Sequence, residues 1–171
     1  CGVALSALIT KADSLPEFLD QVGSDADLLR KTRPTAVNLF YGIDHVLTAI
    51  MSSQTIEEAK SRAVDAAEEV IDADRRTCHA IGKTGLEVIP DGARILTHCN
   101  AGALACAEWG TALGVIRSAH EAGKNISVYA CETRPLLQGA RLTTWELLRD
   151  GIDVTLIIDS MAAVLMRKGA I

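Results

Sequence analysis

Hydrophobic and polar residues follow two different periods along the chain, and the change falls near residue 90. Up to that point, apolar residues recur every three or four positions, as they do on one face of an amphipathic helix. After it, short apolar runs rich in β-branched residues alternate with helical stretches. The pattern therefore predicts a helical domain over residues 1–90 and a mixed α/β domain over residues 91–171.

Capping residues predict where helices of the first half begin. Residues 2–10 are apolar and indicate the end of a helix. Ser14 followed by Pro16 predicts the next start, because serine caps free N–H groups and proline fits the first helical turn. Thr55 and Glu58 have the spacing of a capping box, which predicts a long helix running to about residue 81.

Arg33 lies between two of these predicted helices. Pro34 disfavours a helical conformation at the residue before it, and Thr35 is suited to cap the helix that follows. Arg33 is therefore expected on an extended segment at a helix N-terminus, where unpaired N–H groups favour anions. A solvated surface arginine is the alternative, and it is the more common case.

The second half contains three successive strand–helix units. The expected strands are residues 95–98, 126–130 and 154–158, and the expected helices are residues 110–121, 136–148 and 162–168. This alternation indicates a parallel sheet with right-handed crossovers, as in doubly wound or Rossmann-like folds. The carboxyl ends of the strands should share one edge, which is where open α/β sheets bind ligands.

Cys99 ends the first expected strand, and Asn100, Ala101 and Gly102 follow it. These three residues carry little side-chain bulk, so their N–H groups can approach an anionic ligand closely. The pattern indicates a phosphate-binding loop beside a candidate acid. Burial of Cys99 as a small hydrophobic residue is the alternative, because free cysteines are commonly buried.

Arg134 and Gln138 stand after the second expected strand, at the start of a helix. From there they can reach hydroxyl or phosphate oxygens in the crevice. Helix capping and a surface position explain the same spacing equally well. No Gly-x-Gly-x-x-Gly motif follows the first strand, so a nicotinamide cofactor is not expected.

Composition excludes several classes of protein. The chain has 171 residues, of which 49% are hydrophobic, and a net charge of −5, which is typical of one large or two small globular domains. No dense Lys/Arg cluster favours nucleic acid, and no apolar run is long enough for a membrane span. The five cysteines lack zinc-ligand spacing, so we expect no metal site, no disulfide framework and a cytoplasmic location.

Four stretches of the chain closely resemble the methylthioribose-1-phosphate isomerase family, which is related to the regulatory subunits of translation initiation factor 2B. They are residues 32–39, 97–105, 110–116 and 132–143. The resemblance covers nearly the whole chain and keeps the order of the motifs. It implies an N-terminal helical domain followed by a Rossmann-like domain, incomplete at both ends, in an enzyme that is usually a homodimer.

The activity implied by the resemblance is the isomerisation of 5-methylthioribose 1-phosphate to 5-methylthioribulose 1-phosphate in methionine salvage, without metal or redox cofactor. Cys99 matches the family's cysteine, which we expect to act as the acid. Arg33 and Gln138 match residues expected to hold phosphate or sugar hydroxyls. The other expected substrate-binding residues are Asn100, Gly102 and Arg134.

Two elements of the family have no counterpart in the chain. An Arg-Gly-Ala-Pro loop would precede Cys1, and a strand bearing the catalytic aspartate would follow Ile171. The expectation is a fragment, or one piece of a protein whose second chain carries the rest. Ribose-1,5-bisphosphate isomerase and a non-enzymatic regulatory subunit remain the alternatives. The apolar stretch from Ala101 to Leu104 favours the methylthio substrate over the bisphosphate.

Overall fold

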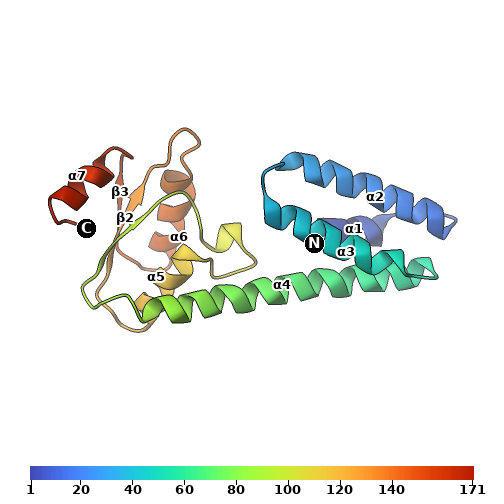
Figure 1. Ribbon diagram of the computed structural model, residues 1–171, viewed down its shortest axis with the longest axis horizontal. Coiled ribbons are helices and arrows are strands. Elements are labelled where there is room, and N and C mark those ends of the chain that lie inside the picture. The colour runs from blue at the N-terminus through green and yellow to red at the C-terminus, as the bar shows by residue number, and fades with distance from the viewer. The chain divides into compact units, whose positions relative to one another are not determined.

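The computed structural model describes residues 1–171 and divides into two compact units, Cys1–Ala73 and Asp74–Ile171 (Figure 1). Each unit has its own hydrophobic core. The division falls inside the long helix α4 (Ile56–Leu86), which contributes to both units. The change of hydrophobic period near residue 90 lies after the end of this helix, so it marks the change from helical to α/β secondary structure.

The first unit is entirely helical. It contains α1 (Gly2–Ile9), α2 (Leu15–Thr32), α3 (Val37–Met51) and the first part of α4. Large apolar side chains of α2 and α3 pack against alanines of α4. The core residues of these helices include Phe18, Val22, Ile43, Val46, Ile50, Ala59 and Ala63. Ala59 and Ala63 are four positions apart, so they lie on one face of α4, and both are fully buried.

Two of the three predicted caps are confirmed. The Oγ of Ser14 accepts a hydrogen bond from the N–H of Glu17, and Thr55 Oγ1 accepts one from the N–H of Glu58 at 3.2 Å. The prediction for Thr35 was wrong, because α3 begins after Ala36 and no side chain caps it. The N–H of Ala36 instead donates to the carbonyl of Arg33, forming a turn that shifts the start of the helix.

The second unit contains a parallel sheet of three strands in the order β1-β2-β3. These strands are β1 (Arg94–Thr97), β2 (Ser127–Cys131) and β3 (Val154–Ile157), so each predicted strand is confirmed to within one residue. Thr97 pairs with Ala130, and Cys131 pairs with Ile157. This register brings the three carboxyl ends to one edge and confirms the expected Rossmann-like α/β class.

Helices follow each of the strands. They are a short 3₁₀ turn η1 (Ala103–Ala105), α5 (Ala112–Glu121), the π-helical turn η2 (Gly139–Thr143), α6 (Thr144–Arg149) and α7 (Met161–Arg167). The helix predicted from residue 136 begins later, because Leu137 has a φ of 61° and leaves the helical region. At Gly139 a side chain would overlap the carbonyl of Cys131, so the backbone requires glycine there.

The core of the second unit lies between the sheet and helices α5 and α6. Leu113 and Ile116 of α5 and Leu147 of α6 are fully or almost fully buried against Val128 of β2. Burying each of these large side chains stabilises the fold by about 1.5–3 kcal/mol relative to exposure. This packing holds the sheet rigid behind the loops at its carboxyl edge.

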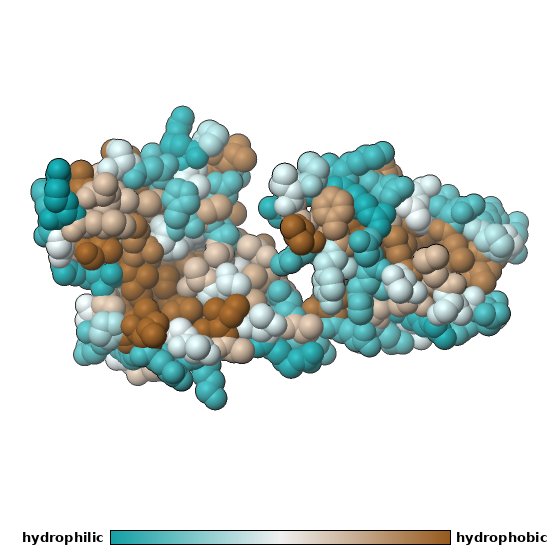
Figure 2. Space-filling model, viewed as in Figure 1, coloured by the Kyte–Doolittle hydropathy of each residue, from teal (hydrophilic) through white to brown (hydrophobic).

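Some apolar surface of the second unit stays exposed, and Figure 2 shows apolar side chains gathered on its visible face. Leu156 in β3 and Ile158 just after it are 49% and 53% exposed, and β3 is an edge strand of the sheet. None of the residues of α7 is buried. None of the helices is both long and apolar enough to cross a membrane.

Candidate functional site

One residue at the end of each strand takes part in a chain of hydrogen bonds across the sheet edge. The N–H of Cys99, after β1, donates to Thr133 Oγ1 after β2 at 2.8 Å. The N–H of Thr133 in turn donates to Asp159 Oδ1 after β3, also at 2.8 Å. The predicted ligand edge is therefore a connected structure in which the loop of each strand supports the next.

The backbone of Cys99 is held in an uncommon conformation. Its φ is 62°, and that of Thr133 is 63°, a region that residues other than glycine seldom occupy and that β-branched residues occupy least. The carbonyl of Cys99 also accepts a hydrogen bond of 2.5 Å from Thr143 Oγ1. Both polar backbone groups of Cys99 are thus fixed by threonines from elsewhere in the chain. Strained residues held in this way cluster at functional sites.

Glu146 supports the loop that follows Cys99. Its side chain is only 3% exposed, and its carboxylate accepts hydrogen bonds of 2.8 Å from Asn100 Nδ2 and from the N–H of Ala103. A side chain at Gly102 would overlap this carboxylate, so glycine is required for the loop to pass over it. The carboxylate of Glu146 therefore accepts the hydrogen bonds that groups on the inner side of this loop could otherwise donate to an anionic ligand.

Arg117 neutralises this buried carboxylate. Its Nη2 lies 2.8 Å from Glu146 Oε2, and its Nε lies 2.7 Å from Asp150 Oδ2. Burial by itself raises the pKa of Glu146, but hydrogen bonds from Arg117, Asn100 and Ala103 outweigh it and leave the pKa below its ordinary value. Glu146 is therefore ionised at neutral pH, and a buried charge that is paired and hydrogen-bonded is tolerated.

Asp159 positions the second loop. Its two carboxylate oxygens accept hydrogen bonds of 2.8 Å from the N–H groups of Thr133 and Arg134. These bonds, that of Arg134 first, lower the pKa of Asp159. The side chain of Arg134 is exposed and that of Gln138 is half-buried, so both are accessible to a ligand at this edge.

The structure brings together five of the six residues singled out from the sequence. Four lie in the two loops of the second unit, and Gln138 stands at the start of the π-helical turn. Asn100 uses its amide nitrogen internally, toward Glu146 and Thr143. Arg33 belongs to the first unit, where it is exposed at the end of α2 with a φ of −144°, as expected for a non-helical residue. Their roles in substrate binding stay predictions.

Sequence analysis missed the residues that support these loops. Thr133 and Thr143 lie in residues 132–143, where the sequence pattern indicates Arg134 and Gln138, and Glu146 has the spacing of an ordinary helix residue. Asp159 directly follows residues 154–158, the third expected strand. The available signal was the position of Thr133 and Asp159 directly after strands, where loop residues meet in an open sheet.

The class of the chain is defined by a helical unit followed by a parallel sheet, with a cysteine at the sheet edge whose backbone is fixed by hydrogen bonds. The sequence profile of the Initiation factor 2 subunit family matches residues 2–171, and the chain is a member of that family. Methylthioribose-1-phosphate isomerases from Heliobacterium modesticaldum and Geobacter metallireducens are 54% and 52% identical to it. The matches cover 98% and 99% of the chain but 49% and 50% of those proteins.

Two crystal structures show the same fold. The 5-methylthioribose 1-phosphate isomerase from Pyrococcus horikoshii OT3 matches with a TM-score of 0.88 and 42% identity, over 98% of this chain and 48% of that one. A protein from Archaeoglobus fulgidus, described as subunit delta of translation initiation factor eIF-2B, matches with a TM-score of 0.86 and 50% identity, over 99% and 50% of the two chains. The chain spans about half the length of the relatives that it matches.

Proposed function

We propose that the protein is an aldose–ketose isomerase that converts 5-methylthioribose 1-phosphate into 5-methylthioribulose 1-phosphate, a step of methionine salvage. The observation that carries this proposal is the position of Cys99, at the ligand edge of a parallel sheet with its backbone held by Thr133 and Thr143. Relatives more than 50% identical to the chain bear the name of this enzyme, which supports the same activity.

Cys99 is the proposed general acid. The substrate is a closed ring whose C1 carries the phosphate, so the reaction needs a proton on the ring oxygen before the chain can open. The thiol of Cys99 supplies that proton, the hydrogen on C2 is transferred to C1, and a carboxylate removes the proton of the C2 hydroxyl. The oxidation at C2 is balanced by the reduction at C1 within one molecule, so no external electron acceptor is consumed.

Asp159 has a positioning role in this scheme. Both of its carboxylate oxygens already accept hydrogen bonds from backbone N–H groups, which leaves them poorly suited to remove a substrate proton. It holds Thr133, and Thr133 holds Cys99. The carboxylate that acts on the C2 hydroxyl is therefore a different residue.

Three polar side chains are proposed to hold the phosphate or the sugar hydroxyls. Arg134 and Gln138 follow β2 at the same edge as Cys99, and Arg33 is exposed in the first unit. Guanidinium groups form charge-assisted, often paired hydrogen bonds with phosphate, which suits both arginines to this task. Asn100 and Gly102 are proposed to contribute through the shape and backbone of their loop.

We assign the protein to the cytoplasm, where a free sugar phosphate is available, and we propose that it works as an assembly, most simply a homodimer, or together with a second chain. The apolar edge at β3 supports this, because Leu156 and Ile158 expose large side chains that association would cover. Neither a nucleic acid nor a membrane is part of the proposal.

A regulatory role without catalysis is the second candidate. It is favoured by the Archaeoglobus fulgidus structure, whose description is that of an initiation factor subunit. A regulatory subunit would gain nothing from a proton-donating residue at position 99. Ribose-1,5-bisphosphate isomerase, the other enzymatic alternative, would need a second phosphate-binding group near the apolar residues of the Cys99 loop.

An isomerase assay of the purified protein with both sugar phosphates separates these functions. With the whole protein, including the part that supplies the carboxylate acting on the C2 hydroxyl, we expect turnover of 5-methylthioribose 1-phosphate, and a fall in kcat of about 10²–10⁴-fold in the Cys99→Ala variant, with substrate binding retained. Cys1→Ser is the matched control because Cys1 is exposed in the other unit. Unchanged turnover in Cys99→Ala would show that the acid lies elsewhere, and binding without turnover of either substrate would favour the regulatory role.

A further inference from the structure

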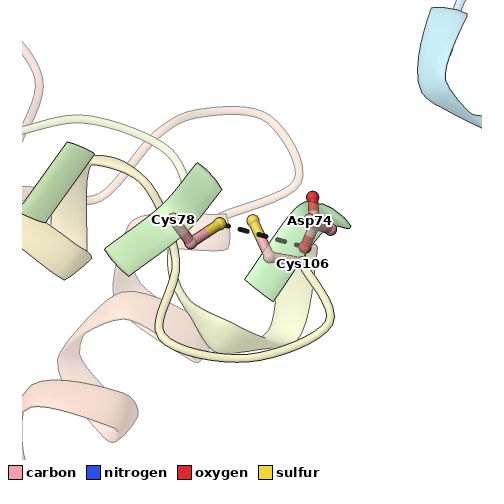
Figure 3. Close-up of side chains that lie close together, drawn as sticks. All are labelled: Asp74, Cys78 and Cys106. Carbon is pink, nitrogen blue, oxygen red and sulfur yellow. Dashed lines mark hydrogen bonds between the residues drawn. The ribbon is translucent and has the colours of Figure 1, made fainter. Parts of the chain in front are cut away.

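A group of side chains of the kinds that can ligate a metal ion lies in the second unit, outside the site at the sheet edge. Asp74 and Cys78 are four residues apart on α4, and Cys106 comes from the segment between β1 and α5. One carboxylate oxygen and the two sulfur atoms lie within 4.8 Å of one another. Figure 3 shows the sulfur of Cys106 near those groups of the helix.

Hydrogen bonds already hold these groups together. The N–H of Ala107 donates to Asp74 Oδ2 at 2.7 Å, which ties the residue after Cys106 to α4. The thiol of Cys78 donates to the same carboxylate oxygen at 3.8 Å. Cys78 is only 1% exposed, whereas Asp74 and Cys106 are half-buried, so the group has a closed inner side and an accessible outer side.

We propose that Asp74, Cys78 and Cys106 form a binding site for a thiolate-preferring divalent cation, with Zn²⁺ as the chemical type. Two thiolates and one carboxylate are ligands that Zn²⁺ accepts, and soft thiolate ligands select against Mg²⁺ and Ca²⁺. Helix positions i and i+4 present both α4 ligands on one face. Solvent at the accessible side completes a tetrahedral set of ligands.

Binding at this site is coupled to proton release. Without a cation, Cys78 and Cys106 are free thiols. The cation replaces both thiol protons: one divalent ion enters, two S–H bonds break and two protons leave to solvent. Affinity therefore rises with pH, because fewer protons must be displaced.

The cation would act as a structural link. It would join α4 to the segment between β1 and α5, which carries Cys99, Asn100 and Gly102 at its start. A ligand that binds only the folded state stabilises it by mass action. The site takes no part in the proposed isomerisation, and the inference stands whether or not the isomerase proposal holds.

The test is a titration of the reduced protein with Cd²⁺, whose thiolate complexes absorb in the ultraviolet, followed by competition with Zn²⁺ and native mass spectrometry. We expect one ion per chain and a higher unfolding temperature with the ion bound. Cys78→Ser and Cys106→Ser should lose the absorbance, and Asp74→Asn should weaken binding by about 10-fold or more. Cys1→Ser should bind as the unchanged chain does.

Three results would overturn the inference. The first is a reduced, folded chain that binds no Cd²⁺. The second is retention of the ion by Cys78→Ser or Cys106→Ser. The third is loss of Cd²⁺ binding in His98→Gln, because His98, Cys131 and Asp159 also have ligand atoms within 4.8 Å of one another. Circular dichroism of each variant shows whether a lost signal reflects unfolding. The Asp74→Asn variant retains both thiols, so its affinity for Cd²⁺ is an independent measure of the site.

Discussion

The backbone N–H of Cys99 donates a hydrogen bond of 2.8 Å to the hydroxyl of Thr133, 34 residues away in the chain. The bond joins the ends of β1 and β2, and both residues have a positive φ. Thr133 is buried, and its hydroxyl also contacts the carbonyl of Cys131. The direction in which the candidate acid is presented thus depends on a side chain from the neighbouring strand.

Thr133→Val should lower kcat while leaving the overall fold intact. Valine keeps the shape of threonine but removes the acceptor, so the N–H of Cys99 loses its partner at a cost of roughly 1–3 kcal/mol. We expect a fall in kcat of about 5- to 150-fold, measured beside KM and the unfolding temperature. Thr133→Ser should restore most of kcat. Equal activity of the valine and serine variants would contradict the positioning role.

Arg134→Ala should raise KM for the sugar phosphate. Loss of a charge-assisted hydrogen bond to phosphate costs roughly 1.5–3 kcal/mol in kcat/KM. Gln138→Ala and Arg33→Ala are expected to act in the same direction, with a smaller effect at the neutral glutamine. Arg149→Ala is the control, because its guanidinium lies over the ring of Trp145, 5.3 Å from the centroid. An equal rise in KM at Arg149 would show that the effects are unspecific.

Glu146 should make the stability of the protein depend on acid pH. Its folded-state pKa is lowered, so the unfolded chain binds its proton more readily than the folded chain does. The stabilisation is complete above the ordinary glutamate pKa of about 4.3 and is lost as pH falls through the lower folded-state value. Urea unfolding at a series of pH values measures this dependence.

Glu146→Gln provides the matched comparison. It removes the charge, leaves Arg117 with only Asp150 as an acidic partner, and should destabilise the protein by about 3 kcal/mol, as expected when one member of a buried ion pair is lost. It should also flatten the acid limb of the stability profile. A variant with an unchanged acid limb would show that other carboxylates cause the pH dependence.

Replacing apolar residues at the β3 edge should reduce self-association of the 171-residue chain. Leu156→Lys places a charge on β3, whose outer edge is unpaired, and Ile158→Lys places one directly after this strand; such charges block strand pairing. Light scattering after gel filtration measures the mass over a range of concentrations. Val88→Lys is the control, because Val88 is also exposed but lies before the sheet. An equal reduction by Val88→Lys would exclude the edge as the contact.

The sequence by itself determined most of the secondary structure. Strands and helices follow from hydrophobic periodicity, which acts over a few residues, and Ser14 and Thr55 cap helices through bonds to residues three positions away. Thr35 shows where such reasoning ends, because a turn at Arg33 moved the helix start by one residue. The sequence pattern also does not indicate the division into two units inside α4, since the helical pattern continues across that division.

Tertiary structure alone decided what surrounds the candidate acid and the cation site. The position of Cys99 at a strand end was visible in its local sequence, whereas Glu146 meets Asn100 across 46 residues and Thr133 meets Cys99 across 34. Cys106 lacks a metal partner at any recognisable sequence spacing, yet the fold places it beside Cys78. Local spacing carries no information about contacts between residues this far apart, because strand pairing and loop packing bring them together only when the whole unit folds.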